Sequence, residues 1–180
     1  YFAGKIAGQD TPVFTGIPSD PTVEQFKALS AALAASASVS MFHAVGVTPE
    51  APTLEDAFGG REPEKVLVFG EAEKAQAEAA LNKEPSDHVD WILVGCPNAS
   101  VQEIREVAEA LEGKKVHPDV SLWVTTAGAM YAMAERVGYI KTIEDAGGTV
   151  VRETCPFLAR SRVIAPNKGY KTLTTNSAKM

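Results

Sequence analysis

The chain has 180 residues, of which 45% are hydrophobic and 22% are charged, and its formal net charge is −6. This composition is typical of a folded globular chain with enough residues for a hydrophobic core, and it excludes a disordered or collagen-like protein. The acidic balance, 17 Lys and Arg against 23 Asp and Glu, argues against a nucleic-acid-binding surface.

The apolar segments are too short or too interrupted for a membrane span. Residues 28–47 form the longest apolar run, and several serines and a histidine interrupt it. The chain starts at Tyr1 and lacks the basic start, apolar run and cleavage site of a secretory signal. Its two cysteines are too few for a disulfide scaffold and suit a compartment that keeps thiols reduced. We therefore expect a fragment of a cytoplasmic protein.

In the first half, short β-rich runs alternate with helical stretches, a pattern that predicts an α/β fold with parallel strands covered by helices. The predicted strands are residues 13–17, 39–45 and 65–69, and the predicted helices are residues 21–37, 53–58 and 71–81. Asp20-Pro21 is a favourable helix start, and Gly59-Gly60 is a favourable helix end.

The second half follows a polar segment at residues 83–87, which contains a proline and is the predicted hinge. The predicted strands are residues 89–95, 120–125 and 149–154, and the predicted helices are residues 100–111 and 127–146, the latter interrupted near Gly138. The run VDWILVG is nearly all apolar, as expected for a central strand buried on both faces. The predicted organisation is two βαβ lobes, residues 1–84 and 85–156, with an irregular site-forming tail at residues 157–180.

The two cysteines occupy matching positions. Cys96-Pro97 and Cys155-Pro156 each follow a predicted strand. If the strands are parallel, both thiols lie at the same edge of a sheet, where open α/β folds bind ligands. The alternatives are two separate buried thiols, a disulfide, or a zinc site that adds a histidine such as His43.

Other candidate residues also follow predicted strands. His43 lies in the run SMFHAVG, directly before a loop at residues 46–52 that carries a hydroxyl and a carboxylate. Such a loop can form a ligand wall, although a strand histidine is also common in a core. Asn98 and Ser100 stand at a helix start, which suits either helix capping or contact with an anion. The P-loop, GxGxxG, GxSxG and HExxH motifs are absent from the sequence.

Five segments together resemble one family. They are MFHAVGVTPEAPTLEDAFGG (residues 41–60), DWILVGCPNASVQEI (90–104), LWVTTA (122–127), ERVGYIKTIEDAGGTVVRETCP (135–156) and TTNSAKM (174–180). In this order and spacing they resemble the large subunit of aconitase X-type dehydratases. The resemblance covers most of the chain from residue 39 onward, and the first 38 residues are compatible with it.

The resemblance implies an aconitase-like fold and the dehydration of a small hydroxy acid, such as mevalonate 5-phosphate or a hydroxyproline. It also implies a [2Fe–2S] or [4Fe–4S] iron–sulfur cluster, with Cys96 and Cys155 as ligands and a further ligand in sequence upstream of this chain. The exposed iron of such a cluster acts as a Lewis acid on the leaving hydroxyl, while a base removes a proton. The resemblance does not identify this base.

By the same resemblance, His43, Thr48, Asn98 and Ser100 line the substrate cavity, and Ser177 and Lys179 hold a carboxylate or phosphate. Asn98 stands where the family often has histidine, so no proton transfer is assigned to it. The implied partner is a small subunit or a fused swivelling domain, and we expect little or no activity from this chain alone. The alternative function is a non-catalytic α/β module that binds a small ligand and has structural cysteines.

Overall fold

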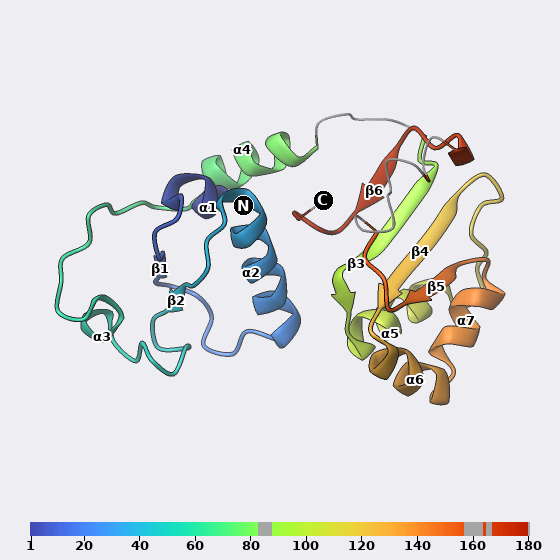
Figure 1. Ribbon diagram of the computed structural model, residues 1–180, viewed down its shortest axis with the longest axis horizontal. Helices are drawn as coiled ribbons and strands as arrows, with labels where there is room; N and C mark the ends of the chain where they lie inside the picture. Colours follow the sequence, from blue (N-terminus) through green and yellow to red (C-terminus); the bar gives the residue numbers. More distant parts are fainter. Residues whose placement is uncertain (83–87, 157–163, 165–166, 180) are drawn as a thin grey trace. The chain divides into compact units, whose positions relative to one another are not determined.

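The computed structural model describes residues 1–82, 88–156, 164 and 167–179 (Figure 1). The chain divides into two compact units, Tyr1–Glu84 and Pro85–Ala178. Both units contain parallel strands flanked by helices, so the predicted α/β class is confirmed. Within the described residues, no helix is long and apolar enough to cross a membrane.

The first unit has a small parallel sheet in which β1 (Val13–Phe14) pairs with β2 (His43–Ala44). Its helices are α1 (Phe2–Ala7), α2 (Val23–Ala37), α3 (Leu54–Phe58) and α4 (Glu71–Leu81). Thr22 begins α2 and Thr53 begins α3 with a capping box, in which the hydroxyl accepts a backbone N–H of the first turn. Helix α3 thus starts after Thr53 as predicted, whereas α2 starts two residues after the predicted Pro21, because Thr22 rather than Asp20 is its N-cap.

Small side chains and aromatic rings pack this unit. Gly4 of α1 lies so close to α2 that a Cβ added there would be 1.9 Å from Ser36 Oγ. Phe42 contacts Phe14 and Phe26 at ring-centroid distances of 5.9 and 5.7 Å. A larger residue at position 4 would displace the Ser36 side chain, and the rings join the sheet to α2.

The strand predicted at residues 65–69 is wrong. These described residues form no strand, and their large apolar side chains are exposed, with Val66 at 77% and Val68 at 82%. The apolar run has the composition of a buried strand, but a strand needs a neighbouring strand to satisfy its backbone groups. In the first unit β1 and β2 pair with each other over two residues each, and the run has no place in that ladder.

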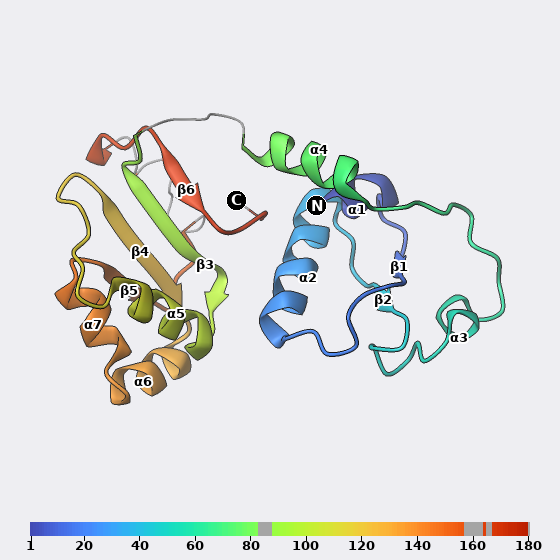
Figure 2. The same ribbon diagram turned by 180° about the vertical axis from the view of Figure 1, so that it is seen from behind.

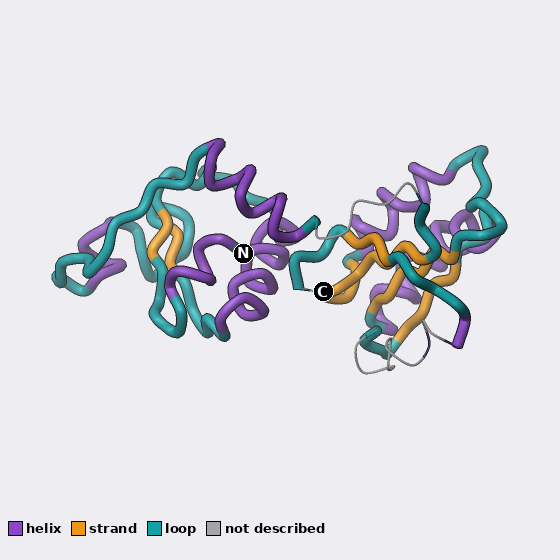
Figure 3. The backbone as a smooth tube through the Cα atoms, turned by 90° about the horizontal axis from the view of Figure 1, so that it is seen from above, coloured by secondary structure: helices purple, strands orange, loops and turns teal. Residues whose placement is uncertain are grey.

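The second unit has a four-stranded parallel sheet with the order β5-β4-β3-β6 (Figure 2). Figure 3 shows strands in orange and helices in purple. Its strands are β3 (Trp91–Ala99), β4 (Ser121–Thr126), β5 (Thr149–Arg152) and β6 (Leu173–Thr175). β3 lies between β4 and β6, as its apolar sequence predicts. Residues 173–175 form a strand where the sequence predicted an irregular tail, and residues 157–163 of that tail lie outside the described residues.

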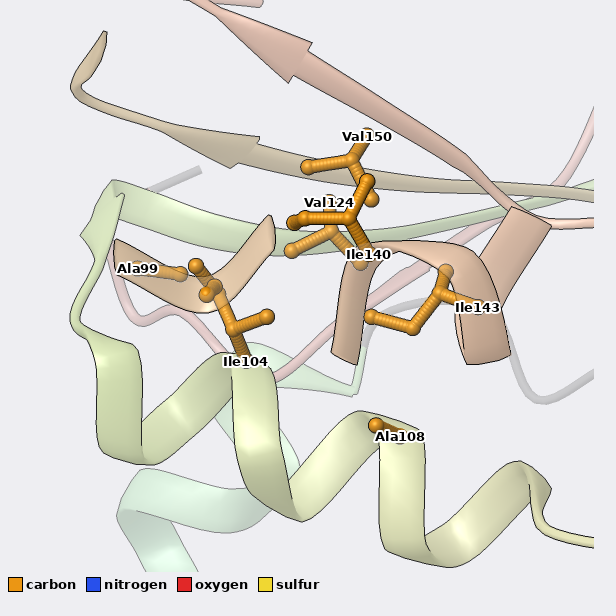
Figure 4. Close-up of a cluster of buried hydrophobic side chains, with 8 residues drawn as sticks. Ala99, Ile104, Ala108, Val124, Ile140, Ile143 and Val150 are labelled. Carbon is orange, nitrogen blue, oxygen red and sulfur yellow. The ribbon is translucent and has the colours of Figure 1, made fainter. Parts of the chain in front are cut away.

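Three helices share one hydrophobic core with this sheet. They are α5 (Val101–Leu111), α6 (Gly128–Arg136) and α7 (Tyr139–Asp145). The buried cluster comprises Ala99, Ile104, Ala108, Val124, Ala134, Ile140, Ile143 and Val150 (Figure 4). Gly138, with φ of 89°, separates α6 from α7, so the predicted helix interruption is confirmed. The core holds the sheet in place and leaves the carboxyl ends of its strands to the loops.

Asp90 connects β3 to the segment before β6. Its carboxylate accepts the backbone N–H groups of Lys171 and Thr172 at 2.7 and 2.8 Å, and it also pairs with His88. The N–H donors of Lys171 and Thr172, followed by His88, hold the pKa of Asp90 below its usual value. The ionised carboxylate therefore fastens β6 to the edge of the sheet.

This attachment predicts a pH dependence of stability. Because the folded pKa is depressed, the stabilisation from Asp90 is fully present above its unfolded pKa and is lost as the pH falls through the folded pKa. We expect Asp90→Asn to lower the urea midpoint of unfolding at pH 7. We also expect the midpoint of this variant to fall less than that of the wild-type chain as the pH is lowered from 5 through the folded pKa of Asp90. His88→Gln is the control, since it removes only the smallest contributor. Equal acid sensitivity of Asp90→Asn and the wild-type chain would contradict the assignment.

Candidate functional site

The carboxyl end of β3 carries the first cysteine. The register between β3 and β4 shifts between Val94 and Ala99, so the residues between them leave the regular ladder. Cys96 lies in this bulge with 8% of its surface exposed, next to a cis peptide bond to Pro97. The bulge brings a buried thiol to the edge of the sheet where the neighbouring parallel strands also end.

Side-chain hydroxyls bind the carbonyl groups of this bulge. Thr125 Oγ1 donates to Gly95 O at 2.5 Å, and Thr126 Oγ1 donates to Ala99 O at 2.7 Å. Ser177 Oγ donates to Cys96 O. These threonine roles have no local motif in the sequence, because they depend on the pairing of β3 with β4.

The second cysteine lies at the same edge. Cys155 follows β5 by three residues and is partly exposed. β3 and β5 both pair in parallel with β4, so the prediction that both cysteines lie at one sheet edge is confirmed. Both thiols are free, which differs from the disulfide alternative. The edge therefore offers two sulfur donors, one on each side of β4.

Asn98 and Ser100 follow Cys96 and lead into α5. The Ser100 hydroxyl accepts the Glu103 N–H at 3.2 Å, and the Glu103 carboxylate accepts the Ser100 N–H at 2.8 Å. The predicted capping role of Ser100 is therefore confirmed. Asn98 is exposed at the same helix start. Contact of either residue with a ligand stays a prediction.

The first unit carries a second group of predicted residues. His43 lies in β2, its side chain is 14% exposed, and its Nδ1 is 3.1 Å from Glu50 Oε1. The Thr48 hydroxyl accepts the Ala44 N–H and donates to Ala44 O at 3.1 and 3.2 Å. Thr48 thus shapes the loop that returns Glu50 to the histidine.

Glu50 is the residue of this loop whose role the sequence did not reveal. Its own backbone N–H, His43 and Thr48 lower its pKa from the usual value. Residues seven apart on a straight helix or strand are too far apart for this contact, so the folded loop brings the two together. The pair can fix which imidazole nitrogen carries the proton.

Ser177 and Lys179 follow β6. Ser177 contacts the cysteine bulge through Cys96 O, and its backbone N–H donates to Thr175 Oγ1 at 3.2 Å. Lys179 is exposed at the end of the described chain. The structure therefore brings Ser177 together with Cys96, while His43 and Thr48 form a separate group in the first unit.

Two family models match the chain in succession. The model described as the second domain of aconitase X matches residues 1–79, and the model described as the third domain of aconitase X matches residues 89–180. The chain belongs to the aconitase X family. The resemblance read from the motifs after residue 39 is confirmed and extends over the first 38 residues as well.

Curated relatives agree with this assignment. The chain is 36% identical over 180 residues to a cis-3-hydroxy-L-proline dehydratase of Pseudomonas aeruginosa, covering 99% of this chain and 31% of the relative. It is 38% identical over 182 residues to a phosphomevalonate dehydratase large subunit of Methanothermobacter thermautotrophicus, covering 99% of this chain and 42% of the relative. The chain thus spans well under half the length of these relatives.

A solved structure supports the fold. The crystal structure of aconitase X from Thermococcus kodakaraensis in its holo form aligns with a TM-score of 0.80 at 31% sequence identity. The alignment covers 99% of this chain and 43% of that one. The second and third domains of aconitase X therefore describe the two units of this chain.

The cysteine bulge predicts a strict requirement for Gly95. Its φ is 95°, and an added Cβ would be 2.1 Å from the backbone oxygen of Thr125. We expect Gly95→Ala to lower the free energy of unfolding by more than about 2 kcal/mol, measured by urea denaturation. Gly113→Ala is the matched control, since Gly113 also has positive φ but open space around it. Equal losses in the two variants would refute the close approach.

The His43–Glu50 pair predicts a defined tautomer. An ionised Glu50 favours the imidazole tautomer that carries its proton on Nδ1, the nitrogen that lies 3.1 Å from Glu50 Oε1. We expect Glu50→Ala to reduce the Nδ1–H share of His43, measured by ¹⁵N chemical shifts at neutral pH. Glu55→Ala, in α3, should leave these shifts unchanged. An unchanged tautomer in Glu50→Ala would show that the pair does not orient the ring.

Proposed function

We propose that this chain is part of the large subunit of a hydro-lyase that dehydrates a small hydroxy acid by means of an iron–sulfur cluster. Membership of the aconitase X family supports this function, and so do relatives named as dehydratases. Because the chain spans only part of these relatives, the activity belongs to an assembled enzyme that includes the remaining large-subunit sequence.

The position of the two cysteines is the observation that carries the proposal. Cys96 and Cys155 lie at the carboxyl edge of one parallel sheet, and thiolates are the usual ligands of iron–sulfur clusters. Such clusters need more protein ligands than two, and among the residues described in this structure no group of three or more His, Cys, Asp or Glu side chains could hold a metal ion. The two thiols therefore fit the cluster by their chemistry, and a further ligand would come from elsewhere in the enzyme.

When bound, the cluster supplies a Lewis acid for the leaving hydroxyl of the substrate. His43, oriented by Glu50, would hold a proton at a fixed imidazole nitrogen. Asn98 and the backbone N–H groups at the start of α5 would bind a substrate carboxylate. In this proposal His43 would serve proton transfer, and Asn98 with the start of α5 would orient the substrate.

The tail after β6 supplies a cation. Lys179 would hold the carboxylate or phosphate of the substrate. Ser177, whose hydroxyl also donates to Cys96 O, would be the second contact of this anion.

The complete enzyme would include a partner, a small substrate and a cytoplasmic location. A small subunit or swivelling domain would complete the site, in keeping with relatives named as large subunits. The substrate belongs to the class of hydroxyprolines and mevalonate 5-phosphate, on which the relatives are named to act. Two free thiols suit the reducing conditions of the cytoplasm.

The proposal predicts that both cysteines are needed to hold iron. The chain should be expressed anaerobically within its complete large subunit and together with the small subunit. We expect iron, sulfide and visible absorption in the wild-type protein, and a severalfold loss of iron in Cys96→Ser and in Cys155→Ser with circular dichroism unchanged. Thr154→Ser, next to Cys155, is the control and should retain iron.

Two results would contradict the proposal. Zinc without sulfide would indicate a different metal site. A colourless, metal-free assembled protein would instead indicate a binding module with structural cysteines. Iron and sulfide together would justify a screen of small hydroxy acids as substrates.

A further inference from the structure

The bulge around Cys96 is held from both neighbouring strands. β4 supplies the hydroxyls of Thr125 and Thr126 on one side, and the segment after β6 supplies the hydroxyl of Ser177 on the other. Their acceptors are the carbonyl groups of Gly95, Ala99 and Cys96. The three bonds thus cover the bulge from its first residue to its last.

Burial makes the two threonine bonds costly to break. Thr125 and Thr126 are both 0% exposed, although strand positions this deeply buried usually carry apolar residues. A buried carbonyl that loses its donor has no water to replace it. The Thr125 hydroxyl therefore satisfies the carbonyl of Gly95, which lies within the register shift, and the Thr126 hydroxyl satisfies the carbonyl of Ala99, where the pairing with β4 resumes.

The backbone at Gly95 limits the bulge to this one arrangement. Gly95 lies against the Thr125 backbone oxygen, which leaves no room for a side chain. Thr125 thus contacts the bulge through its backbone and through its hydroxyl. With the carbonyl groups at both ends and at Cys96 held, the direction of the Cys96 side chain is restricted.

We infer that Thr125, Thr126 and Ser177 are positioning residues that hold the Cys96 thiol in the geometry of a metal ligand. The metal role rests on the proposed function, whereas the restriction of the thiol does not. The three hydroxyls act through the backbone of the bulge and leave the sulfur for the ligand. Ser177 thus supports Cys96 in addition to the substrate contact proposed for it.

The test uses the reactivity of Cys96 in the full chain. In a Cys155→Ser background Cys96 is the only thiol, and its reaction with 5,5′-dithiobis(2-nitrobenzoic acid) reports how often the bulge opens. We expect Thr125→Val, Thr126→Val and Ser177→Ala each to raise this rate about tenfold, which corresponds to about 1.4 kcal/mol. Thr125→Ser and Thr126→Ser keep the hydroxyl and should react at nearly the original rate.

A control separates local opening from a general loss of stability. Ile143→Val removes a methylene from the buried core of the same unit without touching the bulge. The rate should rise more in the threonine variants than in Ile143→Val at an equal loss of urea midpoint. Equal rates at equal stability, or serine variants as reactive as valine variants, would overturn the inference. Ser177→Ala keeps the test usable if a valine variant does not fold.

Iron retention in the assembled enzyme distinguishes this inference from the proposed function. If the valine variants expose Cys96 and also lose iron severalfold faster to a chelator, both stand. If they expose Cys96 but the wild-type assembly holds no iron, the positioning of the thiol stands and the proposed function fails. If iron is held and the variants leave Cys96 reactivity unchanged, the positioning role fails alone.

Discussion

The second unit depends on one constraint. The backbone groups of β3 must stay hydrogen-bonded where the regular pairing of this strand with β4 is interrupted. β3 pairs regularly with β4 through Val94 and resumes at Ala99. Between these residues the hydroxyls of Thr125 and Ser177 donate to the carbonyls of Gly95 and Cys96, and the hydroxyl of Thr126 donates to the carbonyl of Ala99, where the pairing resumes. The residues around Cys96 are thus arranged by the hydrogen bonds that the backbone carbonyl groups of the bulge require. β6 contributes because it brings Ser177 to the bulge.

The first unit achieves order in a different way. Each strand of its sheet pairs over only two residues, so hydrogen bonds within the loop after β2 position the residues of that loop. Thr48 folds this loop back on Ala44, which returns Glu50 to His43. The contact between His43 and Glu50 therefore depends on the hydrogen bonds of this loop more than on the short sheet.

Local signals in the sequence predicted much of the fold but little of the support around the site. The helix starts at Thr53 and Ser100 and the apolar run of β3 each depend on signals within a few residues, and these predictions are confirmed. β6 was missed because its sequence, Leu-Thr-Thr, is short and polar and its strand depends on pairing with β3. The contacts of Thr125 and Glu50 likewise depend on partners that only the folded chain brings near.

The exposed apolar run at residues 65–69 has a practical consequence for handling the chain by itself. Four consecutive large apolar residues, Val66, Leu67, Val68 and Phe69, belong to no helix or strand and are at least half exposed. β-branched and aromatic residues without a neighbouring strand readily pair with the same segment of another molecule. The net charge of −6 opposes such association at low ionic strength, but added salt screens that repulsion. Purification in high salt therefore favours aggregation through this segment, whereas a low-salt buffer at low protein concentration favours the monomer.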